Sequence, residues 1–114
     1  MNVLSVRDTL LLVLDAVYHF EAPAGKPERY VVWGETSVDM RVNADNKTEY
    51  AAVSGEILFY TAYEYDTKAD EIANVFAGKG IVCNLTAIGY DYETSYTVYT
   101  YVFEVSCGKG NLYT

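Results

Sequence analysis

The first pattern along the chain is a run of apolar residues at helical spacing, which predicts a helix beginning near Ser5. Ser5 and Asp8 have the spacing of a capping box, in which each side chain satisfies a free backbone donor. On the side of this helix opposite its apolar stripe, Leu11 and Leu12 fall among charged residues. The helix is therefore either covered on two sides by its own domain or presents a leucine patch to another subunit. The apolar stripe consists of Val6, Leu10, Val13, Leu14 and Val17.

Two short strands are predicted next, over residues 18–20 and 30–33, where aromatic and β-branched residues are dense. The segment between them contains Pro23 and Pro27. Proline fixes φ and has no backbone N–H, so this segment is predicted to be a loop.

Alternation of period two runs through residues 36–47, where Val38, Met40 and Val42 are separated by polar residues such as Asp39. This pattern predicts a strand with one face in water. A turn then leads into residues 48–65.

Residues 48–65 are predicted to be one long strand, with Gly55 marking a β-bulge. Fully extended, this strand would reach roughly 50 Å at ~3.3 Å per residue, more than a domain of this size can cover. The hairpin over residues 38–60 is therefore predicted to project as an arm or a sheet edge that faces a partner.

A second helix is predicted after residue 65, capped by Asp66 or Thr67. It ends at the glycines 78 and 80, because glycine accepts the left-handed conformation of a C-cap. A final hairpin is predicted from strands over 81–92 and 95–105. The narrow apolar stripe of the helix consists of Ala69, Ile72, Ala73 and Phe76.

These elements predict a single α+β domain over residues 1–105, followed by a loose tail over 106–114. The expected order is one helix, three or four strands, a second helix and two strands, or α-β-β-β-β-α-β-β if four strands are counted. Because helices and strands do not alternate one by one, we expect a mainly antiparallel sheet with two helices packed on one face and a projecting long hairpin.

Charge limits the possible partners of this 114-residue chain, which carries 16 acidic and 8 basic residues and a formal charge of −8. Such a surface repels free nucleic acid, although it suits a passage through which DNA slides. The beginning of the chain lacks the features of a signal peptide, and no apolar run is long enough to span a bilayer. We therefore expect a cytoplasmic protein without membrane partners.

No residue pattern advertises catalysis, a cofactor or a metal. His19 is the single histidine and is predicted to lie on the face opposite Tyr18 and Phe20, where a structural or surface role is favoured over catalysis. Cys83 and Cys107 lack metal-ligand spacing and are expected to be reduced thiols. The twelve tyrosines suit either a small sheet or a surface that is buried on assembly.

Several segments in this order resemble the small tail-completion, or tail-terminator-like, proteins of long-tailed bacteriophages and prophages. The resemblance spans most of the chain. It rests on the leucine helix with Val6-Arg7-Asp8, on Val17-Tyr18-His19-Phe20-Glu21-Ala22-Pro23, on Tyr30-Val31-Val32-Trp33-Gly34-Glu35, on Ala44-Asp45-Asn46-Lys47, on Tyr65-Asp66 and on Tyr99-Thr100-Tyr101-Val102-Phe103-Glu104-Val105.

The resemblance implies a non-enzymatic virion protein, assembled in the bacterial cytoplasm, that forms a ring, commonly a hexamer. Such a ring stops the growth of the tail tube, binds the tail-tube protein and the head-tail connector, and leaves a channel in which DNA is passing cargo. As candidates for the subunit interface we expect Leu11, Leu12, Val38, Met40, Val42, Tyr50 and Tyr60. Acids expected to line or approach the lumen are Asp39, Asp45 and Glu49.

Two alternatives remain open. One is another virion part, either a tail-tube subunit or a head-tail adaptor, and a tube subunit would polymerise indefinitely where a terminator closes. The other is a small enzyme or ligand-binding domain, which a deep pocket at His19 or Trp33 would support.

Overall fold

The computed structural model describes residues 1–42, 49–108 and 110–114. The described residues form two helices and one five-stranded sheet, so the chain has the α+β fold that its sequence predicts. The helices are α1 (Leu4–Leu10) and α2 (Lys68–Lys79), and the strands are β1 (Val17–His19), β2 (Arg29–Val42), β3 (Glu49–Thr61), β4 (Val82–Asp91) and β5 (Tyr96–Gly108).

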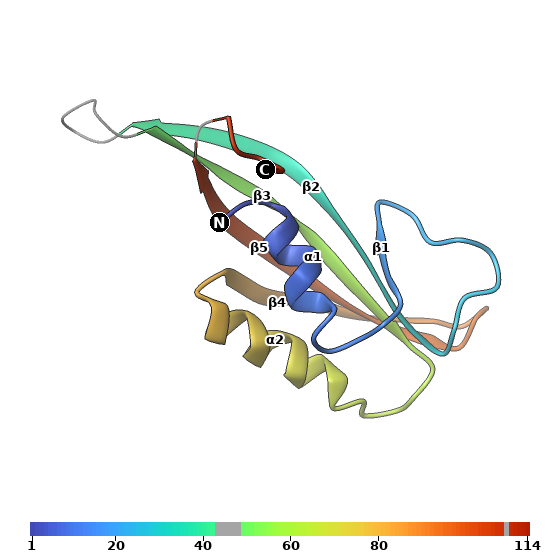
Figure 1. Ribbon diagram of the computed structural model, residues 1–114. Coiled ribbons are helices and arrows are strands. Elements are labelled where there is room, and N and C mark those ends of the chain that lie inside the picture. Colours follow the sequence, from blue (N-terminus) through green and yellow to red (C-terminus); the bar gives the residue numbers. More distant parts are fainter. Residues whose placement is uncertain (43–48, 109) are drawn as a thin grey trace.

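The strands are arranged in the order β1-β2-β3-β5-β4. All neighbouring pairs are antiparallel except β1 and β2, which are parallel over three residues. Both helices lie on the same side of the sheet, and the β2–β3 hairpin extends beyond them (Figure 1). We call the side under the helices the helix face and the other side the open face.

The core lies between the helix face and the two helices. Phe76 of α2 and Leu10 of α1 are fully buried against inward-facing residues of the central strands. Tyr101 is buried as well, and its hydroxyl donates to the carbonyl oxygen of Ala69 in α2 at 2.7 Å. Alternate residues of the central strands supply the sheet side of this core, namely Val31, Trp33, Val53, Ile57, Phe59, Phe103 and Val105.

The beginning of α1 differs from its prediction. The residue before the helix is Val3, and no side chain caps it. Ser5 lies inside the first turn and accepts a hydrogen bond from the backbone N–H of Asn2, while Asp8 pairs with Arg7, so the predicted capping box is wrong. The helix ends at Leu10, and residues 11–13 continue as turns, in which the backbone N–H of Leu12 donates to the carbonyl oxygen of Thr9 at 3.1 Å.

Between the helices the structure has three strands. Residues 30–33 and 38–42, whose patterns differ, belong to the single strand β2, which bends at a bulge between Glu35 and Ser37. This bulge lies opposite Gly55, as the glycine indicated. A Cβ atom on Gly55 would lie 2.6 Å from the Phe103 ring, so glycine allows that ring to pack against β3.

Beyond the bulge, β2 and β3 continue as the part of the sheet that we call the arm (described residues 36–42 and 49–54). The sheet has three strands here, because β5 pairs with the β3 side of the arm as far as Tyr50 and Gly108. Residues 36–40 of β2 are exposed on both faces, so the prediction of one wet face is wrong there. Alternation in β2 does not correspond to a covered face within this chain.

The start of α2 is held by Asp66, which is buried. Its carboxylate pairs with the Arg29 guanidinium at 2.7 Å, accepts from the Thr61 hydroxyl at 2.6 Å and accepts from the backbone N–H of Lys68 at 3.0 Å. Asp66 therefore performs the predicted capping, and Thr67 makes no side-chain cap bond. At the other end Gly80 adopts the left-handed conformation, as predicted.

The C-terminal segment is not a loose tail in its described part. Residues 106–108 belong to β5 and pair with β3. After the turn, Leu112 packs against the core, and its carbonyl oxygen accepts from the backbone N–H of Val3 at 2.8 Å. The chain end thus covers part of the helix face that the helices leave open.

Candidate subunit interface

The free edge of the arm places two of the expected interface residues together. Val38 and Met40 pair with Val53 and Ala51 of the core, so they lie on the helix face. They are nevertheless 52% and 53% exposed, because no helix reaches this part of the sheet. β1 pairs with β2 only at residues 31–33, so beyond Gly34 no described strand pairs with the edge of β2 that faces away from β3.

The other expected arm residues are distributed differently. Tyr50 is half-buried, and Tyr60 stacks on Tyr30 with ring centroids 4.6 Å apart, which makes Tyr60 part of the sheet's own packing. Among the expected lumen acids, Asp39 is exposed and lies on the open face opposite Ala52. Asp45 lies outside the described residues, as do the side chains of Val42 and Glu49, whose backbones pair at the end of the ladder.

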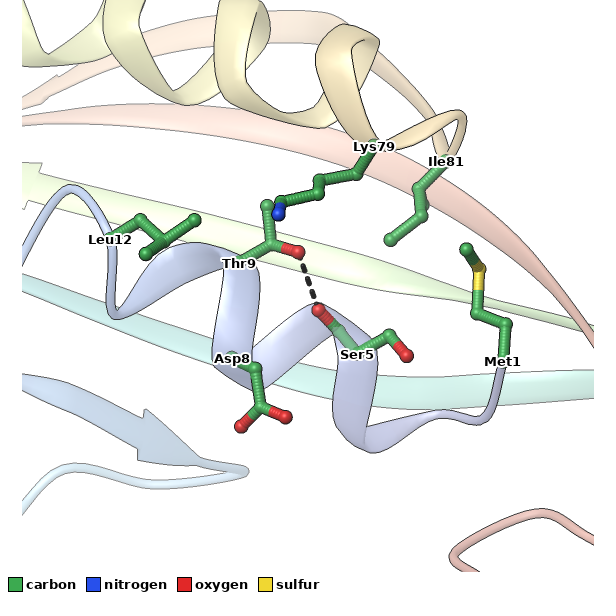
Figure 2. A pocket seen from close by; sticks show the side chains of 7 residues that line it. All are labelled: Met1, Ser5, Asp8, Thr9, Leu12, Lys79 and Ile81. Atoms are coloured by element: carbon green, nitrogen blue, oxygen red, sulfur yellow. Dashed lines mark hydrogen bonds between the residues drawn. The ribbon is translucent and has the colours of Figure 1, made fainter.

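The two leucines that follow α1 are exposed by 46% and 64%. Leu12 borders a groove of about 280 Å³ between α1 and the end of α2, whose lining side chains are drawn in Figure 2. Thr9 in this groove donates its hydroxyl to the carbonyl oxygen of Ser5 at 2.6 Å, and Lys79 reaches in from α2. The described part of the chain leaves Leu11 and Leu12 largely exposed, so the interpretation of a helix covered on two sides by its own domain is wrong.

Strand β4 forms an exposed surface that was not among the interface residues predicted from the sequence. It forms the end of the sheet opposite β1, and nine of its ten residues are exposed. From Val82 to Tyr90 it contains no charged residue. In a chain of net charge −8, this absence of charge was the sequence signal that could have identified β4 as a contact surface. Its exposed large apolar side chains are Val82, Leu85, Ile88 and Tyr90.

His19 belongs to a polar cluster at the end of β1. Its Nε2 pairs with the Glu35 carboxylate, which also accepts from the Tyr113 hydroxyl. Burial opposes ionisation of Glu35, but these two hydrogen bonds outweigh it and hold the pKa of Glu35 below its ordinary value. The His19 ring stacks on Phe20 at 3.9 Å, so the two rings are not on opposite faces as predicted. Phe20 has a φ of 67°, which breaks the strand alternation.

A small open hollow of about 170 Å³ lies beside this cluster on β2 and β3. Trp33 and Glu35 contribute to its lining, but His19 does not. Most of the lining is apolar, and Phe20 lies directly over Gly34, where a Cβ atom would lie 2.5 Å from the ring. The hollow therefore offers space for a side chain more readily than for a substrate.

The thiols are unbridged, and neither is activated. Burial raises the pKa of the Cys83 thiol to about 11, and burial also raises that of Cys107. In the described ranges no three His, Cys, Asp or Glu side chains are grouped as metal ligands. None of the described helices is both long and apolar enough to cross a bilayer.

Comparison of the chain with protein-family models and with curated proteins finds no match.

Proposed function

We propose that this protein is a structural subunit of a phage or prophage tail, which forms a ring that completes the tail tube and joins it to the head connector. The proposal starts from the ordered resemblance of residues 6–105 to tail-completion proteins. The observation that carries it furthest is the arm. There Val38 and Met40 lie on a face that is core elsewhere in the sheet, yet this chain leaves them uncovered.

Exposed apolar residues on an ordered strand favour an assembling protein, because monomers rarely maintain such surfaces without a partner. A ring is a head-to-tail assembly, in which one surface of a subunit contacts a different surface of the next. The arm supplies one surface. The groove at Leu12 and the edge strand β4 are two different surfaces that could receive it.

The open face supports a role around DNA that does not involve binding it. Asp39 and Glu56 lie exposed on this face, where register places Glu104 as well. If the helices face outward in the ring, these acids line the channel. Like charge between the channel and phosphates keeps DNA from adhering to the wall.

The first test is the native mass of the purified chain by light scattering, followed by negative-stain microscopy. We expect a closed ring, of six copies if it follows the proteins it resembles, with a central channel. Tubes that grow without limit would identify a tube subunit. A monomer up to millimolar concentration would contradict the ring.

The second test is charge reversal in the phage or prophage that encodes the chain. We expect Asp39→Lys to leave ring formation intact and to lower infectivity at least about tenfold, because the lysine attracts passing phosphates. Asp70→Lys, at an exposed position in the first turn of α2, is the matched control and should leave infectivity unchanged. Equal infectivity of both variants and the wild type would remove Asp39 from the channel.

A further inference from the structure

We infer that the ring closes by strand pairing, with the β4 edge of one copy hydrogen-bonded to the arm edge of β2 in the next copy. This inference rests on the proposed ring, and it names the two surfaces and the register in which they meet. It makes the assembled sheet continuous from subunit to subunit.

The β4 edge has little of the usual protection of an exposed strand. Proteins guard free edges with lysine, proline, inward-pointing charge or β-bulges, because unpaired N–H and C=O groups bind other strands. Between Val82 and Tyr90 there is no charged residue and no proline. A single bulge between Leu85 and Ala87 interrupts it. A strand of this length and composition is a pairing surface.

The arm edge of β2 fits β4 because their exposed apolar side chains share a face. Leu85 and Ile88 pair with Tyr101 and Tyr99 of β5, which places them on the helix face. Val38 and Met40 also lie on the helix face. Side by side in one sheet, the two sets would cover one another and extend the core across the boundary between copies.

Direction and position agree with this pairing. β2 and β4 run antiparallel within the sheet, so copies that are related by rotation about the ring axis and extend one sheet present antiparallel edges to each other. β1 occupies β2 at residues 31–33, so β4 of the neighbour must pair further along, next to the arm. Successive copies are then staggered by roughly 20 Å at ~3.3 Å per residue. A stagger is what a closed sheet requires, since its strands tilt about 35–45°.

The occupant of the β4 edge is a second copy for two reasons. Copies that each carry a charge of −8 repel one another, and residues 82–90 of β4 form a long exposed edge where contact brings no charged side chain of β4 against the next copy. Pairing of β4 with a second β4 would leave Val38 and Met40 exposed. Head-to-tail pairing covers both edges of every copy in a ring.

Two lysine substitutions and their mixture test the pairing. Ile88→Lys places a charge on the β4 edge, at a side chain that is 62% exposed, and Met40→Lys does the same on the arm. Tyr65→Lys, at a side chain that is 87% exposed in the loop before α2, is the matched control. Circular dichroism and the melting temperature of each variant verify that the monomer still folds.

We expect Ile88→Lys and Met40→Lys each to weaken self-association on the order of 100-fold, because a charge must be desolvated at the boundary. Tyr65→Lys should assemble like the wild type. An equimolar mixture of Ile88→Lys and Met40→Lys should form a one-to-one dimer, since the first keeps its β2 edge and the second keeps its β4 edge.

Each other outcome has a separate meaning. If only Ile88→Lys lost assembly and no mixed dimer formed, head-to-tail pairing would be overturned. The copies would then pair through their two β4 edges. Rings that survive both substitutions would overturn the strand pairing and leave the proposed tail function standing. Mixed dimers from a chain whose wild type forms no closed ring would support the pairing and contradict the tail function.

Discussion

The two ends of the β2–β3 ladder differ in what covers them. At the basal end, beside α1 and α2, Val31 and Phe59 face each other and are fully buried. In the arm, Val38 faces Val53 in the same ladder, yet Val38 is more than half exposed. The strands are continuous, so the backbone pairing between β2 and β3 is the same at both ends. What differs is the layer above the sheet, and an apolar residue in a strand becomes core only where another element covers it.

The largest expected contrast compares Phe59→Ala with Met40→Ala. Phe59 is fully buried, and its truncation should cost about 3–5 kcal/mol in the free energy of unfolding because a cavity remains. Met40→Ala should cost less than about 0.5 kcal/mol, as an exposed position does. Urea denaturation at a concentration where the chain is monomeric measures both. Similar losses would show that the arm is as well covered as the basal end.

A smaller effect is expected from the buried carboxylate at the basal end. Asp66→Asn should cost about 2–4 kcal/mol, because the Asp66 carboxylate is buried and its loss leaves the Arg29 guanidinium without a charged partner. Arg29 is partly exposed, which keeps the loss toward the lower value. Glu71→Gln, which removes an exposed pair with Lys68, is the control and should change stability by less than about 0.5 kcal/mol.

The same carboxylate predicts a pH dependence. Burial opposes ionisation of Asp66, but hydrogen bonds from Arg29, Thr61 and Lys68 outweigh it and hold its pKa below the ordinary value. A folded pKa that is lowered contributes stability above the unfolded pKa, about 3.9, and that contribution is lost as the pH falls through the folded pKa. The difference between wild type and Asp66→Asn should therefore shrink below about pH 4. A constant difference down to pH 2.5 would contradict the pairing.

The smallest expected effect concerns the chain end that covers the helix face near the arm. Leu112 is half-buried, so Leu112→Ala should cost about 1 kcal/mol, as expected from its buried apolar area. Tyr113→Phe removes only the hydrogen bond to Glu35 and should change thermal stability little. A loss of equal size from both variants would mean that the polar contact, rather than the packing of Leu112, holds the segment.

Sequence patterns were sufficient to predict those elements whose structure depends on residues close together in the chain. The stripe of α2, its glycine end and the final hairpin follow from spacing and turn chemistry that involve neighbouring residues. The helix at the beginning was harder to predict, because its apolar stripe continues into Val17, which lies in β1. Periodicity alone does not mark where packing turns the chain.

The sequence by itself determined the α+β class, because alternation and helical spacing record which residues are apolar. It also raised the question whether Leu11, Leu12, Val38 and Met40 face a partner. Only the tertiary structure decided which apolar faces are covered. It merged two predicted strands into β2, brought the chain end back to Val3 and left β4 uncovered at the end of the sheet. Coverage depends on contacts between residues far apart in the chain, and no local pattern contains that information.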